Sequence, residues 1–488
     1  MNPTLHTASP KLTARQQEYM GRQMKFELFS MAWAIAALFH MANHRSYTVS
    51  LAYFLLTISA ILVLVRPSSI GRLTIFILLQ IFQVLTTSPN VSNHWLFTAF
   101  VNLTIIQAIL YLAIKNKSFA IHKDELLKTF APVVRIELLI LYFYVVFHKL
   151  NADFFAPVVS CATEFLVAQD TTGLAATNID LLSFNAYLTI FIEAAIPLFL
   201  CFKKTRNAGL LIGLLFHCIV AYNPKNGFYD FSSMIFGTYI LFTSQEFTDQ
   251  VYRGYTALVS WKNKFKKSVS AFTLPRLFVI LGGVAVVFSL FILLILTLNT
   301  KNFFRELFWS TYNFSFIAIF LLAMSKTRSN QVAIAINPFK LPAWSFLLFP
   351  LIVFMNGLSP YLGLKTENSF AMFSNLRTEG GKTNHYIVPA STQVFDYQKD
   401  LVELVSSSDS YLQEAADRNQ LMVFFSLKNY IKFKRPMRVE YLRNGRRHVF
   451  DLSNPSTHAG LLTPQPLLLR KLLGFRTISK YDPQPCNH

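Results

Sequence analysis

Residues 142–154 read YFYVVFHKLNADF, an apolar run that ends abruptly at Lys149. They close a hydrophobic segment, 133–149, whose length lies in the range that a membrane-spanning helix needs. A cation at membrane depth is costly, so an ionisable residue there is a functional candidate by default. Lys149 is therefore the first candidate catalytic residue. A lysine at a helix end also commonly extends its ammonium group to the lipid headgroups, which is the simpler interpretation.

The composition of the whole chain is that of an integral membrane protein. Of its 488 residues, 53% are hydrophobic and 14% are charged, whereas soluble proteins carry about 25% charged residues. The net charge of +20 is spread over short clusters between apolar segments, so it does not indicate a nucleic-acid partner. The four cysteines form no CxxC pair and no Cys/His set with ligand spacing, and the sequence predicts no metal site.

The hydrophobic segments predict an all-α polytopic membrane protein of about nine to eleven transmembrane helices, followed by a small α+β extramembrane domain. The expected division is a cytoplasmic segment 1–25, a transmembrane domain 26–364 and an extracytoplasmic domain 365–488. The apolar runs are 28–42, 48–65, 73–88, 95–114, 133–149, 187–202, 207–222, 229–244, 277–298, 306–323 and 343–360.

Clusters of lysine and arginine set the expected orientation, because such clusters favour the cytoplasmic side. The N-terminal segment and the connections 115–128, 203–206 and 253–276 are basic, whereas 150–202 contains no Lys or Arg. This pattern places the N-terminus in the cytoplasm and the C-terminus outside it. We therefore expect a multi-pass protein of the cell (inner) membrane or of the endoplasmic reticulum membrane, in contact with membrane lipid.

Two local patterns describe the C-terminal domain. Ser408-Asp409, followed by apolar residues as far as Phe425, predicts a capped amphipathic helix. Residues 438–450 predict a hairpin that turns at Asn444-Gly445.

Four polar features gather at one membrane face in this topology. Asn43-His44 and Asn93-His94-Trp95 lie in outer loops, Lys149 opens the next outer loop, and His217 lies about one turn below the outer end of its span. A single buried histidine is more often a hydrogen-bonded core residue than a catalyst. Convergence of several such residues on one side favours a functional site.

The segment VFHKLNADF, 146–154, resembles the Lys-Leu-(Asp/Asn)-Ala-Asp-aromatic motif of vitamin K-dependent γ-glutamyl carboxylases and their wider relatives, the horizontally transferred transmembrane domain (HTTM) proteins. Phe216-His217-Cys218 and Asn93-His94-Trp95 are similar to two further segments of that family. The resemblance is best over 88–242.

The resemblance implies a membrane enzyme that oxidises or epoxidises a reduced, vitamin K-like hydroquinone with O2. It implies that Lys149 is the base that deprotonates the hydroquinone, with His94 and His217 as further catalytic residues. Burial can lower a lysine pKa by several units, which such a base requires. The quinone pocket is expected to include His148, Asn93, Trp95, Asn151 and Phe216. The coupled step is modification of a peptide or protein substrate on the outer side, with carboxylation by CO2 as one option.

The chain also departs from that family. His148 stands where the animal carboxylases have a second lysine, Asn151 replaces an aspartate, and the outer domain is far smaller. Residues 372–385 look like a recurring element of these relatives, with no role assigned. A multi-pass transporter and a membrane assembly factor without catalysis stay as alternatives.

Cys161 and Cys486 both fall on the outer side, where disulfides can persist. The sequence does not decide whether they pair.

Overall fold

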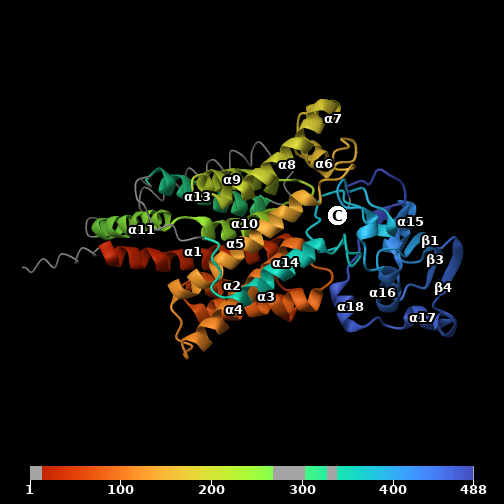
Figure 1. The fold of residues 1–488 in the computed structure, drawn as a ribbon, viewed down its shortest axis with the longest axis horizontal. Helices are drawn as coiled ribbons and strands as arrows, with labels where there is room; N and C mark the ends of the chain where they lie inside the picture. Colours follow the sequence, from red (N-terminus) through yellow and green to blue (C-terminus); the bar gives the residue numbers. More distant parts are fainter. Residues whose placement is uncertain (1–13, 267–302, 327–337, 487–488) are drawn as a thin grey trace, which may run out of the picture.

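Long helices form a bundle, and a small antiparallel sheet follows at one end of it (Figure 1). The computed structural model describes residues 14–266, 303–326 and 338–486. The bundle contains α1 (Ala14–Asn43), α2 (Leu51–Val65), α3 (Ile70–Thr87), α4 (Asn93–Lys115), α5 (Lys123–Phe147), α8 (Ile179–Cys201), α9 (Arg206–Ala221), α10 (Tyr229–Phe242), α11 (Gln245–Lys266), α13 (Phe303–Ser325) and α14 (Leu348–Leu358).

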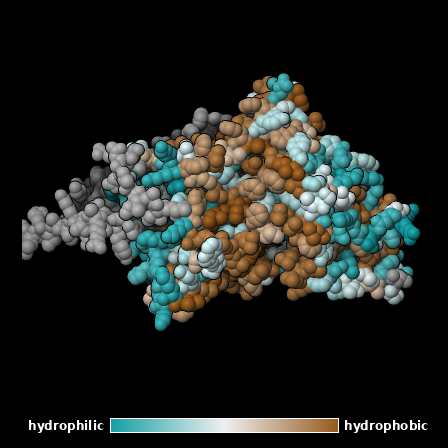
Figure 2. All heavy atoms as spheres, viewed as in Figure 1, coloured by the Kyte–Doolittle hydropathy of each residue, from teal (hydrophilic) through white to brown (hydrophobic). Residues whose placement is uncertain are grey.

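Five of the described helices are long and apolar enough to cross a membrane, namely α3, α4, α5, α8 and the 305–325 part of α13. The shorter helices α2, α9 and α14 are also apolar. Each expected apolar run among the described residues coincides with a helix, whereas the run 277–298 lies outside those residues. Figure 2 shows that hydrophobic side chains cover the middle of the helical bundle on the visible face and that hydrophilic ones gather at both ends.

Helix α5 occupies the centre of the bundle and packs against α4, α8 and α14. It begins at Lys123, ten residues before the expected apolar run, with Asp124 and Glu125 in its first turn. Acidic residues at this position interact favourably with the positive end of the helix dipole. Gly357 allows α14 to approach α5 closely, because a Cβ atom there would meet the ring of Tyr144.

The connections at the two ends of the bundle differ in what they contact. At one end, Ser68 and Ile70 at the start of α3 and residues 121–125 at the start of α5 line one hollow together with Gln23 of α1. At the other end, the start of α4 and the loop after α5 contact the C-terminal region: Asn93 accepts a hydrogen bond from the Phe370 amide at 2.7 Å, and the Ala152 amide donates to the Asn384 carbonyl at 3.1 Å.

The C-terminal sheet has the strand order β4-β3-β1-β2-β5, with every neighbouring pair antiparallel. Its core includes Val402, Leu404, Val439 and Phe450. The elements are β1 (Leu401–Ser407), α15 (Ser410–Asp417), β2 (Gln420–Val423), α16 (Phe424–Lys434), β3 (Arg438–Arg443), β4 (Arg446–Asp451), α17 (Ala459–Leu462), α18 (Leu467–Leu472) and β5 (Ile478–Ser479).

The expected hairpin is confirmed: β3 pairs with β4, and both Asn444 and Gly445 have positive φ, as a tight hairpin turn requires. The expected helix begins as predicted, with Asp409 as its N-cap, but its extent was wrong. Helix α15 ends at Asp417 because Asn419 adopts a left-handed conformation and the next residues join the sheet as β2. The pairing of β2 with β1 overrides the helical pattern of that segment.

Candidate functional site

Lys149 lies just beyond α5, where it forms a buried ion pair. Its Nζ atom is 2.5 Å from both carboxylate oxygens of Glu193, which lies in α8. The lysine is 5% exposed and the glutamate 7% exposed. The ring of Phe154 lies 5.6 Å from the ammonium group. The ammonium group therefore faces a carboxylate and an aromatic ring inside the protein.

The turn that carries Lys149 is fixed by Asn151, one of the predicted pocket residues. The Asn151 Oδ1 atom accepts hydrogen bonds from the amides of Asp153 (3.1 Å) and Phe154 (2.9 Å). Its Nδ2 atom donates to the carbonyls of His148 (2.8 Å) and Ser374 (2.6 Å). The asparagine thus shapes the turn and attaches it to the C-terminal region.

Predicted pocket residues His148 and Asn93 also contact the C-terminal region. His148 is fully buried, with Nδ1 2.9 Å from the Tyr361 hydroxyl and Nε2 3.1 Å from the Ser369 carbonyl. Segment 372–385, which had no assigned role, supplies further contacts: Asn384 donates to Asp153 at 2.7 Å, and His385 Nε2 lies 2.9 Å from the Phe147 carbonyl. This segment holds the C-terminal region against the end of α5.

His217 lies in α9 and belongs to a buried chain of polar groups. Its Nε2 atom is 2.9 Å from the Tyr142 hydroxyl, which is 2.5 Å from the Tyr239 hydroxyl. Its Nδ1 atom is buried and has no hydrogen-bond partner. The predicted pocket residue Phe216 packs with its ring 5.4 Å from that of His217. Tyr142 lies in α5, the helix that ends just before Lys149, so His217 contacts the helix that carries the lysine turn.

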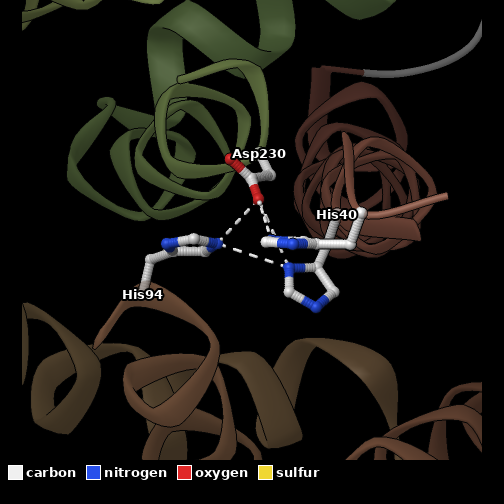
Figure 3. Close-up of side chains that lie close together, drawn as sticks. His40, His94 and Asp230 are labelled. Atoms are coloured by element: carbon white, nitrogen blue, oxygen red, sulfur yellow. Dashed lines mark hydrogen bonds and ion pairs between the residues drawn. The ribbon is translucent and has the colours of Figure 1, made fainter. Parts of the chain in front are cut away.

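His94 lies instead in a cluster around the buried Asp230 (Figure 3). The Nε2 atom of His94 is 2.9 Å from Asp230 Oδ2, and His40 Nδ1 is 3.3 Å from the same oxygen. The predicted pocket residue Trp95 stacks on the ring of His40, with centroids 3.9 Å apart. The ring of Phe231 lies between the two neighbourhoods, 6.1 Å from His94 and 5.2 Å from His217. A single quinone-sized space shared by Lys149, His94 and His217 stays a prediction.

The buried partners of the predicted residues were not identified from sequence: Glu193 for Lys149, Tyr142 for His217, and Asp230 with His40 for His94. Each is an ionisable or polar side chain inside an apolar run, which is itself a signal of function in a membrane helix. Their distances along the chain from the residues they contact gave no indication of the pairing.

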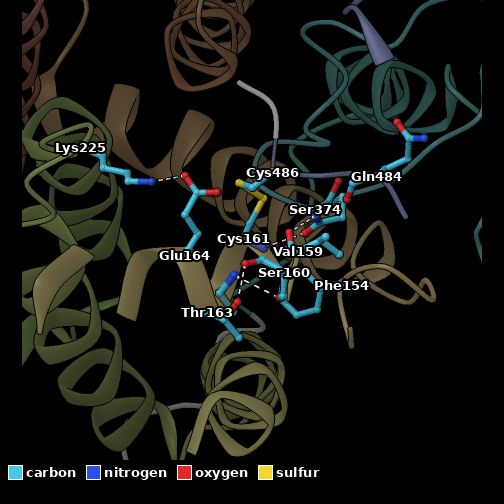
Figure 4. The surroundings of a disulfide bond; sticks show 12 residues. Phe154, Val159, Ser160, Cys161, Thr163, Glu164, Lys225, Ser374, Gln484 and Cys486 are labelled. Atoms are coloured by element: carbon cyan, nitrogen blue, oxygen red, sulfur yellow. Dashed lines mark hydrogen bonds and ion pairs between the residues drawn. A yellow bond between two sulfur atoms is a disulfide. The ribbon is translucent and has the colours of Figure 1, made fainter. Parts of the chain in front are cut away.

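Cys161 and Cys486 form a disulfide, with Cα atoms 4.9 Å apart (Figure 4). Cys161 begins α6 (Cys161–Gln169), which follows the Lys149 turn and precedes the short α7 (Leu174–Thr177). The bond therefore connects the start of α6 to the end of the described chain. Nearby, the Asn375 side chain accepts from the Cys161 amide and donates to the Val159 and Gln484 carbonyls.

No protein-family model, curated protein or solved structure matches this chain. The function is therefore argued from the arrangement of its own residues.

Proposed function

We propose that the chain is a multi-pass membrane enzyme that uses a reduced quinone and O2, with Lys149 as the base. The observation that carries the proposal is the buried Lys149–Glu193 pair at the end of an apolar bundle, beneath the C-terminal region. A buried ion pair gives uncertain net stability, because the loss of hydration can exceed the attraction between the charges. A catalytic role is one reason to retain such a pair.

The chemistry assigned to this pair is proton transfer. Lys149 accepts the hydroxyl proton of the hydroquinone only in its neutral amine form, and Glu193 is placed to hold the proton that the lysine must first release. Deprotonation makes the ring more electron-rich and therefore more easily oxidised by O2. His217 and Tyr142 extend the hydrogen-bonded chain from which protons can be supplied or removed.

The proposal includes the orientation in the membrane. The hydrophobic surface of the bundle supports burial of that region in lipid (Figure 2). The Cys161–Cys486 disulfide supports an oxidising compartment for the C-terminal region, since cytoplasmic disulfides are rare. We therefore place the N-terminus in the cytoplasm and the C-terminal region outside it, and we count about nine to eleven spans.

In this proposal, the acceptor substrate binds on the outer side of the membrane, where the C-terminal region lies. The C-terminal region packs over the Lys149 turn, so a peptide or protein that is modified by the oxygenated quinone would meet this region first. Carboxylation is one such modification. A transporter or an assembly factor would not turn over hydroquinone at the Lys149–Glu193 pair. A turnover assay therefore distinguishes these alternatives from the enzyme.

The test is oxygen consumption by the purified full chain in detergent, with vitamin K hydroquinone as the substrate. We expect turnover by the wild type and a loss of at least about 100-fold in Lys149→Met, the lower range for removal of a general base. The matched control is Lys225→Met, which removes an exposed lysine that is also paired with a glutamate, Glu164. Absence of turnover in the wild type, or equal turnover in Lys149→Met, contradicts the proposal.

A further inference from the structure

Four side chains from three helix ends converge on one point, and none of them takes part in the proton transfer proposed for Lys149 and Glu193. His40 lies in the last turn of α1 and His44 just after it, His94 lies in the first turn of α4, and Asp230 in the first turn of α10. One nitrogen or oxygen atom from each lies within 4.8 Å of the corresponding atoms of all the others. We propose that these four residues bind one Zn²⁺ ion that joins the three helix ends.

The distances between the donor atoms suit a tetrahedral ion. Asp230 Oδ2 lies 3.3 Å from His40 Nδ1, 3.3 Å from His44 Nε2 and 2.9 Å from His94 Nε2, and His40 Nδ1 lies 3.4 Å from His94 Nε2. Zinc bonds of about 2.0–2.2 Å to nitrogen and oxygen place tetrahedral donors about 3.3–3.6 Å apart. His40 and His44 are also four residues apart, and the His44 amide donates to the His40 carbonyl at 3.1 Å, so the last helical turn brings both rings to one face.

The cluster concentrates its donor atoms around one point. His40 Nδ1 and His94 Nε2 lie 3.4 Å apart and both face the same carboxylate oxygen, and the Ser92 hydroxyl lies 3.2 Å from His94 Nε2. With both nitrogens protonated, two N–H groups donate to one oxygen of Asp230; with either nitrogen unprotonated, its lone pair faces that carboxylate. A cation at the centre is bound by the lone pairs of all the donors at once.

The surroundings orient the proposed ligands. Asp230 Oδ1 accepts from the Phe231 amide at 2.9 Å and from Asn43 Nδ2 at 3.3 Å, which leaves Oδ2 directed at the histidines. The His40 ring is held by stacking on Trp95. Contacts of this kind to the residues behind the ligands are a regular feature of metal sites. The His44 side chain is 47% exposed and leaves a route for the ion.

Four protein ligands complete a tetrahedral shell, as in structural zinc sites. The site thus goes beyond the proposed quinone chemistry: it makes His94 a zinc ligand and leaves the Lys149–Glu193 pair unchanged. The ion would fix the ends of α1, α4 and α10 on the face where Asn93 meets the C-terminal region.

The test is zinc binding by the detergent-purified full chain, first stripped with chelator and then titrated with Zn²⁺ alone. Metal content is measured by mass spectrometry and affinity by competition with a zinc indicator. We expect about one tightly held ion per chain and at least tenfold weaker binding in Asp230→Asn and in His44→Ala, by analogy with the cost of disturbing metal sites. His44→Ala removes a half-exposed side chain, so it remains informative if Asp230→Asn does not fold.

His122→Ala is the matched control, because it removes an exposed histidine from a loop before α5, away from the cluster. It should bind zinc as the wild type does. Cobalt in place of zinc should give the strong visible absorption of a tetrahedral site in the wild type and the control, but not in the two cluster variants. Equal zinc affinity in all four proteins, no retained zinc in the wild type, or iron or manganese retained in its place overturns the assignment.

Discussion

At the scale of single residues, Glu193 determines where the Lys149 ammonium group lies. The lysine was expected either to reach the headgroups or to serve chemistry, and the structure places it inside the protein on a carboxylate. Each charge compensates the other in a region with little water. Removing one partner from a buried pair is usually more damaging than removing both, because the remaining charge is left uncompensated.

We therefore predict that Glu193→Leu lowers the free energy of unfolding by about 3–5 kcal/mol. The double variant Lys149→Met/Glu193→Leu should recover most of that loss and remain inactive. Thermal unfolding of the purified proteins in detergent measures both effects. A double variant that is no more stable than Glu193→Leu would show that the pair is not the source of the loss.

At the scale of elements, the irregular segment between α14 and β1 attaches the sheet to the bundle. The amides of Thr366 and Glu367 donate to the Gly474 carbonyl at 3.0 and 2.9 Å. Further along, the buried Glu379 pairs with Arg476 at 3.3 Å. The same segment carries Lys365, whose lowered pKa makes its stability respond to pH.

Lys365 in this segment gives a specific expectation. Burial is the main cause that lowers the pKa of Lys365 to about 8, against a partial opposing effect of Glu367, whereas an unfolded lysine has a pKa of about 10.4. Between these values the unfolded chain binds more protons, so the free energy of unfolding rises with pH.

We predict that the wild type gains stability relative to Lys365→Met from about pH 8 to about pH 10.5, by at most about 3 kcal/mol. Thermal unfolding of both proteins across this range measures the difference. Lys382→Met, at an exposed position of the same segment, is the control and should follow the wild type. Parallel curves for wild type and Lys365→Met would contradict the prediction.

At the scale of the whole molecule, one covalent bond connects the start of α6 to the C-terminal end of the described residues. Cys161 follows the Lys149 turn, and Cys486 lies 325 residues later, beyond the sheet. The bond therefore restricts how far the C-terminal region can move from the bundle. Its formation in cells also reports which side of the membrane this region occupies.

We predict that Cys161 and Cys486 are oxidised in cells whose thiols are trapped before lysis. Cys486→Ser should lower stability by about 2–4 kcal/mol and make the C-terminal region easier to cleave with protease. Cys201→Ser is the control, since Cys201 is a free and exposed cysteine. Full reduction of Cys161 and Cys486 in cells would contradict the extracytoplasmic placement.

The sequence by itself determined most of the local structure, although strand pairing overrode the helical pattern after Asp417. Apolar runs of sufficient length specify helices, and Asn444-Gly445 specifies a hairpin turn, because both depend on neighbouring residues. It also singled out Lys149, His94 and His217, since a polar group in an apolar run is conspicuous. Only the tertiary structure decided their partners. Glu193, Asp230 and Cys486 lie far along the chain from the residues they contact, and such contacts depend on how helices pack, which periodicity and spacing do not encode.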